Sequence, residues 1–230
     1  MKWRSLEEAS AAPQAKSLAE QLRDRRDLAE RYTPADVVAL YQRAIDELCA
    51  SGISEHALKS GDRAPEFSLP DENGNPITSA ALLNRGPLVI CFFRGRWCPY
   101  DVTQLEAMNQ ALPQIQSAGA SLVAISPQKP QQAFFMHDQH KLRFPLLCDA
   151  GNQVARQFGL VYRVPDYQQQ VYQRSFVNLP FANGDSSWEL PAPATYVVAT
   201  DGLIRFARVD VDYRQRPEPA EILDLVKPGG

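Results

Sequence analysis

The residues best suited to redox chemistry lie in one short segment, "RGRWCPYD", at positions 94–101. Its cysteine, Cys98, follows a strongly apolar stretch, and a thiol in such a place becomes a nucleophile once it loses its proton. A dithiol site would have a second cysteine three residues later, but that position is Asp101. The segment therefore predicts either a redox site with one sulfur or the remnant of such a site.

The sequence around Cys98 favours the thiolate. We expect it to begin a helix, where unpaired backbone N–H groups and the helix dipole lower a thiol pKa. Arg94 and Arg96 precede the cysteine, and we expect one or both guanidinium groups to reach the sulfur. Pro99 suits the first helical position, where its missing N–H costs no hydrogen bond. Trp97 is expected to cover one side of the sulfur.

Asp101 opposes these effects, because it lies in the first helical turn on nearly the same face as Cys98. At about 6 Å and an effective dielectric of about 20, two like charges repel by about 2.8 kcal/mol, or about two pKa units. Either the arginines outweigh this repulsion, or the carboxyl group points away or holds a proton. A purely structural alternative is that Asp101 accepts the free N–H groups at the helix start.

The surrounding elements are predicted from their hydrophobic patterns. Residues 87–93, "PLVICFF", form an apolar run typical of a strand that is buried on both faces of a parallel sheet. A helix follows from Pro99, and Pro113 is expected to kink or restart it. Further strands alternate with helices, and a hairpin turns at Asp201-Gly202. This order indicates an α/β fold with a mainly parallel sheet and an antiparallel edge, and its sites form where strands end.

Two other regions flank this alternating pattern. Residues 5–60 have the spacing of amphipathic helices. Residues 161–192 form a long insertion, and loops of this length are often functional. We expect its aromatic side chains to form a wall of the cleft and a contact surface: Tyr162, Tyr167, Tyr172, Phe176, Phe181 and Trp188.

The composition limits the kinds of binding partner and the cellular compartment that we expect for the protein. The net charge of -3 does not favour nucleic acid, and no apolar run approaches the length needed to span a membrane. The first residues lack the apolar core of a signal peptide, so we expect a cytoplasmic protein. The four cysteines form no CxxC pair, and we expect free thiols, no metal site and no cofactor.

Several ordered motifs together resemble the peroxiredoxin-like branch of the AhpC/TSA family. They are "FFRGRWCPYD", "LVAISPQ", "FPLLCDAGNQVARQFGLVY" and "LPAPATYVVATDG", and the resemblance covers about residues 60–225. It implies a thioredoxin-like fold, with a central mixed sheet flanked by helices, as a domain over residues 61–230. Residues 1–60 would then be an N-terminal helical extension.

The resemblance also implies roles for individual residues. Cys98 matches the cysteine that attacks peroxide, displaces an alcohol or water from the O–O bond and becomes a sulfenic acid. Pro193 matches the proline that is cis in thioredoxins and packs against the reactive cysteine. Ordinary peroxiredoxins tend to have an arginine there, so Arg94 or Arg96 would have to replace it in holding the peroxide.

Asp101 departs from the "CPYC" of many members of this branch and makes a disulfide within the motif impossible. The sulfenic acid would therefore need another thiol. We expect an external reductant of the thioredoxin or glutathione type. Cys148, at the end of a predicted strand, is the internal candidate for a resolving thiol, and packing is its alternative role.

We therefore predict a one-cysteine thiol peroxidase that acts on hydrogen peroxide or small organic hydroperoxides. Two alternatives stay open: a thiol–disulfide oxidoreductase that works through mixed disulfides, and a redox-inactive binding protein that keeps the fold. The resemblance and the aromatic insertion suggest a homodimer. Neither a nucleic acid nor a membrane is expected as a partner.

Overall fold

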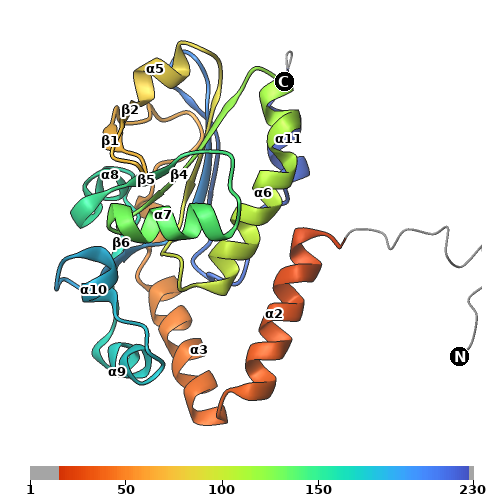
Figure 1. The fold of residues 1–230 in the computed structure, drawn as a ribbon. Helices are drawn as coiled ribbons and strands as arrows, with labels where there is room; N and C mark the ends of the chain where they lie inside the picture. Colours follow the sequence, from red (N-terminus) through yellow and green to blue (C-terminus); the bar gives the residue numbers. More distant parts are fainter. Residues whose placement is uncertain (1–15, 228–230) are drawn as a thin grey trace, which may run out of the picture.

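The computed structural model describes residues 16–227, and a five-stranded mixed sheet in the order β5-β4-β3-β8-β9 forms its centre (Figure 1). The strands are β3 (Leu88–Phe92), β4 (Ser121–Ser126), β5 (Leu146–Cys148), β8 (Ala194–Val198) and β9 (Ile204–Val209). β3, β4 and β5 are parallel, whereas β8 and β9 are antiparallel to their neighbours. The predicted parallel sheet with an antiparallel hairpin is confirmed.

Helices cover both faces of this sheet because the residues of its central strand alternate between them. Val89 and Cys91 of β3 belong to a core cluster built with α6 (Pro99–Ser117), α7 (Pro130–Gln139) and α11 (Pro219–Val226). Leu88 and Ile90 belong to a second cluster, on the side of α8 (Gln153–Gln157). All five residues of β3 are buried, as its apolar run predicts.

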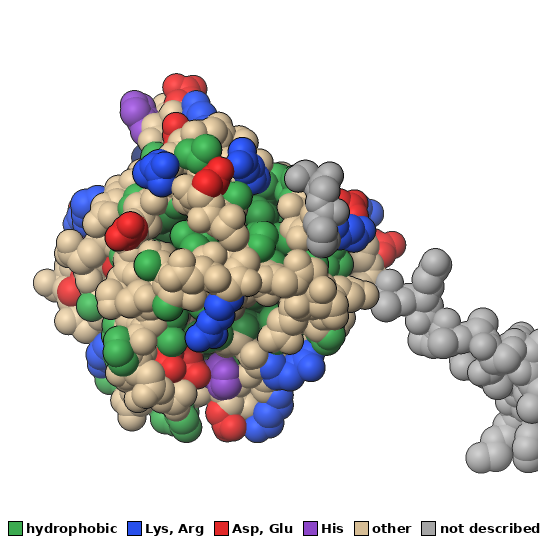
Figure 2. Space-filling view, turned by 90° about the horizontal axis from the view of Figure 1, so that it is seen from above, with side chains coloured by type: hydrophobic (Ala, Val, Ile, Leu, Met, Phe, Trp, Pro, Cys, Tyr) green, Lys and Arg blue, Asp and Glu red, His purple; other side chains and the backbone are tan. Residues whose placement is uncertain are grey.

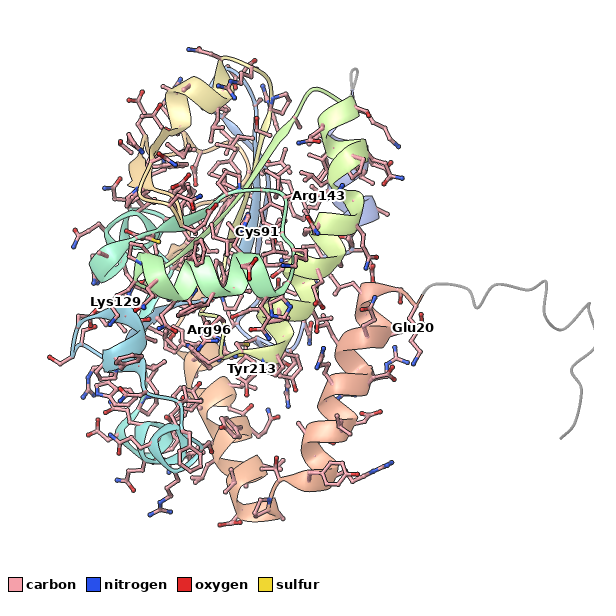
Figure 3. The ribbon with its side chains drawn as sticks, viewed as in Figure 1. Glu20, Cys91, Arg96, Lys129, Arg143 and Tyr213 are labelled. Carbon is pink, nitrogen blue, oxygen red and sulfur yellow. The ribbon has the colours of Figure 1, made fainter. Side chains whose placement is uncertain are left out.

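α6 runs without interruption through Pro113, so the predicted restart of the helix is wrong. Proline at this position removes the hydrogen bond that would reach the carbonyl of Asn109, four residues earlier. A guanidinium N–H of Arg143 donates to that carbonyl at 2.7 Å instead. The replacement leaves no unpaired acceptor, and Figure 3 shows Arg143 beside α6.

The N-terminal helices α2 (Leu18–Tyr32) and α3 (Ala35–Ala50) form a V at one end of the molecule, followed by α4 (Ile53–His56) (Figure 1). A capping box of Ser17 and Glu20 begins α2. Glu218 also accepts two N–H groups of its first turn, at 3.0 and 2.7 Å. The buried Leu18 and Leu22 hold α2 against α6. The predicted helices are confirmed between Leu18 and His56, residues 57–60 are not helical, and positions 5–15 lie outside the described residues.

Smaller elements complete the molecule. β1 (Ser68–Pro70) and β2 (Pro76–Thr78) form the hairpin that precedes α5 (Ser79–Leu83), and the 3-10 helix η1 (Ala150–Asn152) precedes α8. The insertion contains β6 (Val161–Arg163), α9 (Asp166–Arg174), α10 (Leu179–Asn183) and β7 (Glu189–Pro191). β6 pairs with β7, and α9 packs against α3. The insertion is therefore folded and lies against the N-terminal V.

The surface agrees with the small net charge. Acidic and basic side chains are interspersed on the face that Figure 2 shows. Across residues 16–227, no helix has both the length and the apolar character that crossing a membrane requires.

Candidate active site

Cys98 lies where the sequence places it, after the end of β3 and at the N-cap of α6. Its side chain is fully buried. It belongs to a small cluster that joins α2, the start of α6 and the segment after β9, and whose other members are Leu18, Leu22, Trp97, Tyr100, Ala107 and Tyr213. The N-terminal V therefore forms part of the cover over the sulfur. Figure 3 shows Tyr213 near the end of α6 that meets α2 and α3.

Arg94 is the cation at the sulfur. One N–H of its guanidinium group, at Nη2, donates to Cys98 Sγ at 2.9 Å. The guanidinium carbon lies 3.7 Å from the centre of the Tyr213 ring, and Nη1 lies 3.4 Å from the hydroxyl of Tyr172. The side chain is buried, so its attraction for a thiolate is weakly screened by water. Aromatic rings and the sulfur replace the water that would normally surround this charge.

One or both arginines were expected to reach the sulfur, and Arg94 does so, whereas Arg96 contacts other residues. The backbone N–H of Arg96 donates to Gln128 Oε1 at 2.7 Å, and its Nε donates to Gln132 Oε1 at 2.7 Å. These contacts direct the exposed side chain toward the segment around the start of α7. Adjacent Gly95 has a φ of 152°, and a Cβ there would lie 2.5 Å from Trp97 Nε1. Glycine thus lets the chain turn beneath the indole, with one arginine inside and one outside.

Asp101 is a buried structural carboxylate. Its Oδ2 accepts the backbone N–H groups of Arg94 at 2.9 Å and Gly95 at 3.3 Å. Its Oδ1 forms an ion pair with Arg216, and both side chains are fully buried. The expected capping of the helix start by Asp101 is therefore wrong, because the N–H groups that it accepts belong to the preceding loop. Asp101 fixes the backbone that carries Arg94.

Arg216 extends this network to the sheet. Its Nε donates to Gln104 Oε1 at 2.6 Å, and Gln104 donates in turn to Thr195 Oγ1 at 3.2 Å. Its Nη1 donates to the carbonyls of Tyr213 and Gln215 at 2.7 and 2.6 Å. Arg216 therefore positions the segment that places Tyr213 over Arg94. The sequence does not identify these partners of Arg216, because they lie 112–115 positions away.

The pKa of the Cys98 thiol is raised from its ordinary value, contrary to the lowering expected from the helix start and the arginines. Burial is the main cause, since a thiolate without water is costly. Arg94 and Arg216 oppose the increase, and Asp101 adds to it. Access of water to the sulfur would remove the effect of burial on the pKa and leave the lowering by the two arginines against the increase caused by Asp101.

The other buried cysteines lie elsewhere. Cys91, in the middle of β3, and Cys148, at the end of β5, belong to the main core cluster, which does not include Cys98. Burial raises both of their thiol pKa values to about 12, and Glu72 and Asp71 contribute at Cys148. Cys49 is exposed. No disulfide joins cysteines within the described residues, which include all four.

Pro193 is buried just before β8. The part of the chain that the structure describes contains no cis peptide bond, so the expected cis bond before Pro193 is wrong. The Pro193 carbonyl accepts the N–H of Asp210 at 2.8 Å and thereby extends the pairing of β8 with β9. A trans bond suits this extended entry, and an X-Pro bond favours trans unless its surroundings select cis.

An aromatic cleft of about 220 Å³ opens next to the buried sulfur. Arg94, Trp97, Tyr100 and Tyr213 belong both to its lining and to the immediate surroundings of Cys98. Tyr172 and Val177 form the part of the wall that comes from the insertion. Phe176 and Phe181 of the insertion are instead exposed, 98% and 60%. Of the six aromatic residues, Tyr172 lines the cleft, and the partly buried Tyr162 lies beside Arg94 without lining it.

Comparison with known proteins identifies the family. The family model described as "AhpC/TSA family" matches residues 60–207, more than half of the chain. The chain belongs to the AhpC/TSA family. Peroxiredoxin Bcp of Escherichia coli (strain K12) is 32% identical over 103 residues, which is 45% of this chain and 65% of the relative. A putative peroxiredoxin of Mycobacterium tuberculosis (strain CDC 1551 / Oshkosh) is 33% identical over 102 residues, 44% of this chain and 64% of the relative.

Solved structures of AhpC/TSA-type proteins show the same fold. Peroxidoxin BcpB from Mycobacterium tuberculosis has a TM-score of 0.58 at 22% identity, covering 74% of this chain and 96% of that chain. Peroxiredoxin Q of Xanthomonas campestris has a TM-score of 0.54 at 18% identity, covering 70% and 89%. The predicted thioredoxin-like fold is confirmed. The chain spans slightly less than two thirds of the length of the curated relatives named above.

Proposed function

We propose that this protein is a thiol peroxidase in which Cys98 is the nucleophile and Arg94 its cationic partner. The hydrogen bond from Arg94 Nη2 to Cys98 Sγ at 2.9 Å carries the proposal. A charge-assisted donor at this distance stabilises the thiolate relative to the thiol. Peroxiredoxins among the relatives support the same chemistry.

The proposed reaction begins when Cys98 loses its proton. The thiolate attacks one oxygen of a hydroperoxide, an S–O bond forms and the O–O bond breaks. The departing alkoxide or hydroxide takes up a proton, and Cys98 is left as a sulfenic acid. Arg94 is placed to hold the sulfur's negative charge and then the charge that develops on oxygen. Hydrogen peroxide and small organic hydroperoxides are the substrates, which enter through the aromatic cleft.

We propose an external thiol as the reductant. Cys148 lies in a different core cluster and close to two carboxylates, which suits packing better than attack on the sulfenic acid. Its burial and raised pKa keep it protonated at neutral pH. A thiol from solution would condense with the sulfenic acid, release water and form a mixed disulfide, which a second thiol then reduces.

The proposal divides the chain into two parts with distinct tasks. Residues 61–230 would form the thioredoxin-like catalytic domain, and residues 1–60 the extension whose α2 covers Cys98. We expect the protein to act in the cytoplasm, where thiol reductants are plentiful. The exposed Phe176 and Phe181 on the insertion support a homodimer contact, which light scattering of the intact protein would test.

A short pulse of hydrogen peroxide in the presence of a sulfenic-acid trap tests the function. We expect peptide mapping to find the label at Cys98 far sooner than at the exposed Cys49 or the buried Cys148. Protein with Cys98→Ser is the matched control and should lose the early label. Equal labelling of the three cysteines would exclude a peroxidase site and favour the redox-inactive binding protein.

A further inference from the structure

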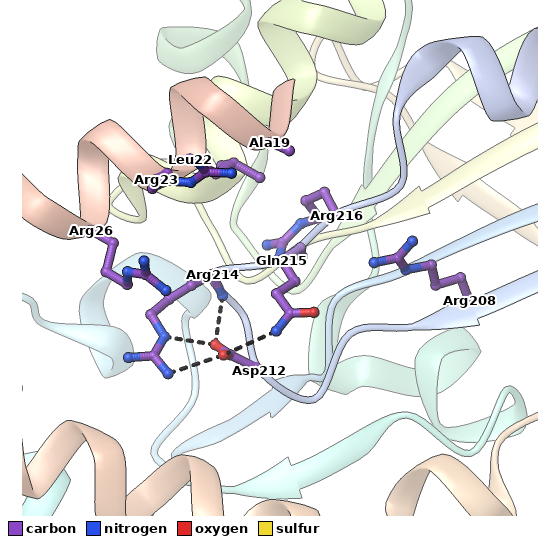
Figure 4. Close-up of a pocket in the computed structure, with 9 residues that line it drawn as sticks. All are labelled: Ala19, Leu22, Arg23, Arg26, Arg208, Asp212, Arg214, Gln215 and Arg216. Carbon is purple, nitrogen blue, oxygen red and sulfur yellow. Dashed lines mark hydrogen bonds and ion pairs between the residues drawn. The ribbon is translucent and has the colours of Figure 1, made fainter. Parts of the chain in front are cut away.

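A second cavity, lined by arginines, lies between α2 and the segment that follows β9 (Figure 4). Its volume is about 240 Å³. Nine residues line it, and five of them are arginines: Ala19, Leu22, Arg23, Arg26, Arg208, Asp212, Arg214, Gln215 and Arg216. One carboxylate among five guanidinium groups is an unusual balance in a protein whose net charge is -3. The charge of the cavity lining therefore favours binding of an anion.

Three of these arginines already have carboxylate partners. Arg216 pairs with Asp101, Arg208 Nε lies 2.9 Å from Asp210, and Arg214 Nε lies 2.8 Å from Asp212. The Asp212 contacts appear as dashed lines in Figure 4. Five arginines face three close carboxylates, so a surplus of two positive charges remains on the cavity wall.

The surplus belongs to α2. The side chain of Arg23 has no ion-pair or hydrogen-bond partner among residues 16–227. Arg26 lies 3.7 Å from Asp27 and 4.0 Å from Glu30, and all three side chains are largely exposed, so these pairs are weak. Glu221 is similarly distant from Arg208, at 3.9 Å. Two guanidinium groups on successive helical turns are thus available to bind carboxylates in a bidentate manner.

The arginine cavity borders the cleft at Cys98, because Arg26 and Arg214 line both. A ligand that extends across these two residues would have its charges in the arginine cavity and its other end at the cleft walls next to the sulfur. These walls include Arg94 and Tyr213. Such a ligand would place an uncharged part in the aromatic cleft and its anionic part beside α2.

The burial of Cys98 decides the size of this ligand. The sulfur has no exposed surface and packs in one cluster with Leu18 and Leu22 of α2. A cysteine on a folded protein would reach it only if α2 moved away, whereas a small thiol in the cleft needs only the side chains between the cleft and the sulfur to move. We propose that the arginine cavity binds the carboxylates of a low-molecular-weight thiol with two such groups, whose sulfur reduces oxidised Cys98. The proposal rests on the function proposed above.

The chemistry balances with the thiol as sole reductant. The bound thiol attacks the Cys98 sulfenic acid, the S–O bond breaks, water leaves and a mixed disulfide forms. A second thiol attacks this disulfide, takes the first as a free disulfide and returns Cys98 as a thiol. Two thiols supply the two electrons that the peroxide consumed. The arginine cavity contributes binding of the thiol and leaves the peroxide step unchanged.

Binding is tested first without catalysis, with S-methylglutathione as an unreactive dicarboxylate probe and Cys98→Ser protein in a calorimeter. We expect the diethyl ester of the probe to bind at least about tenfold more weakly, since it lacks both carboxylates. The double variant Arg23→Gln, Arg26→Gln should weaken binding of the probe about tenfold. Arg31→Gln, also exposed on α2 but outside the cavity lining, is the matched control and should bind normally.

Steady-state kinetics then distinguish the proposed arginine site from the proposed peroxidase function. With otherwise native protein, the double variant should raise the KM for glutathione about tenfold. The single variant Arg23→Gln, whose residue lines the arginine cavity but not the cleft at Cys98, should leave the rate of Cys98 oxidation by peroxide unchanged. Equal affinity for probe and ester, or no effect of the double variant, would overturn the arginine site. If peroxide fails to oxidise Cys98 while binding still depends on Arg23 and Arg26, the peroxidase function is what fails. Unchanged thermal unfolding of the double variant would show that the fold is intact.

Discussion

Cys98 and Cys148 are both buried thiols near the carboxyl ends of parallel strands, yet their charged surroundings are opposite. A guanidinium N–H of Arg94 donates a hydrogen bond to the Cys98 sulfur, with a nitrogen–sulfur distance of 2.9 Å. Cys148 instead lies near Glu72 and Asp71, which add to the effect of burial and raise its pKa to about 12. Burial raises the pKa at both positions, but only Cys98 has cations that oppose it.

The comparison shows that position in the fold does not by itself make a cysteine reactive. A thiolate needs compensation for the water that it loses on burial. At Cys98 this compensation is built from distant parts of the chain: Arg94 after β3, Tyr213 after β9, and Arg216, which holds Asp101. At Cys148, the main core and the neighbouring carboxylates favour the neutral thiol.

The largest expected effect is loss of the nucleophile itself. Cys98→Ser should abolish peroxide reduction, because a hydroxyl group at this position does not ionise at neutral pH. Cys148→Ser should retain most of the activity, since no step requires that sulfur. Peroxide consumption with excess glutathione measures both. Equal loss in the two variants would contradict the one-cysteine scheme and give Cys148 a role in resolution.

The second-largest effect is expected when the positive charge of Arg94 is removed. Arg94→Gln is expected to slow oxidation of Cys98 by about 10²–10³-fold, the usual effect of losing one charge-stabilising donor. Without the positive charge the thiolate is less stable, so the Cys98 pKa rises and the rate profile moves to higher pH. Stopped-flow measurement of oxidation across pH 5–10, a range chosen to span thiol ionisation, tests both expectations.

Arg96→Gln is the matched control for that experiment. Arg96 contacts Gln128 and Gln132 rather than the sulfur, so its variant should keep both the rate and the pH profile. If Arg96→Gln and Arg94→Gln slow oxidation alike, the sulfur has no specific arginine partner and the general positive charge of the segment controls reactivity.

Asp101→Asn should affect stability more than reactivity. Loss of one partner from the buried ion pair with Arg216 should lower the free energy of unfolding by about 3–5 kcal/mol. The asparagine keeps an oxygen for the N–H groups of Arg94 and Gly95, so the loop should hold its shape. Removing a negative charge makes the thiolate easier to form, and the Cys98 pKa should fall.

Urea unfolding and the pH dependence of alkylation measure these two effects separately. Asp138→Asn, on the exposed side of α7, is the control for loss of a carboxylate and should change neither. A rise in the Cys98 pKa on Asp101→Asn would mean that Asp101 stabilises the thiolate by positioning Arg94, rather than repelling it.

Local patterns predicted most of the fold. The apolar run of β3, the hairpin of β8 and β9 and the helix start at Cys98-Pro99 are determined by neighbouring residues, so their elements were found. The helix through Pro113 was not, because its continuity depends on Arg143, thirty positions later in the sequence. Long-range replacement of a hydrogen bond leaves no local signal.

The candidate site likewise combines features that neighbouring residues determine with features that depend on distant parts of the chain. Cys98 and Arg94 were identified from their place after a buried strand, but nothing local distinguishes Arg94 from Arg96. That distinction comes from Gly95, which reverses the chain, and from Gln128, which binds the Arg96 backbone. The repulsion expected from Asp101 was correct in sign, whereas its pairing with Arg216 depends on tertiary structure alone.

The smallest expected effect concerns Cys148 and the carboxylates that lie near it. Glu72 accepts the N–H of Leu146 at 3.0 Å, beside Cys148, and a glutamine oxygen can accept the same bond. Glu72→Gln should therefore preserve the fold and lower the Cys148 pKa by about one unit or less, because one like charge is gone. The pH dependence of Cys148 alkylation under mild urea measures this change. Cys148 stays buried in this variant, so after a pulse of peroxide the sulfenic-acid trap should still label Cys98 first. Early labelling of Cys148 would mean that charge, rather than burial, keeps this thiol unreactive in the native protein.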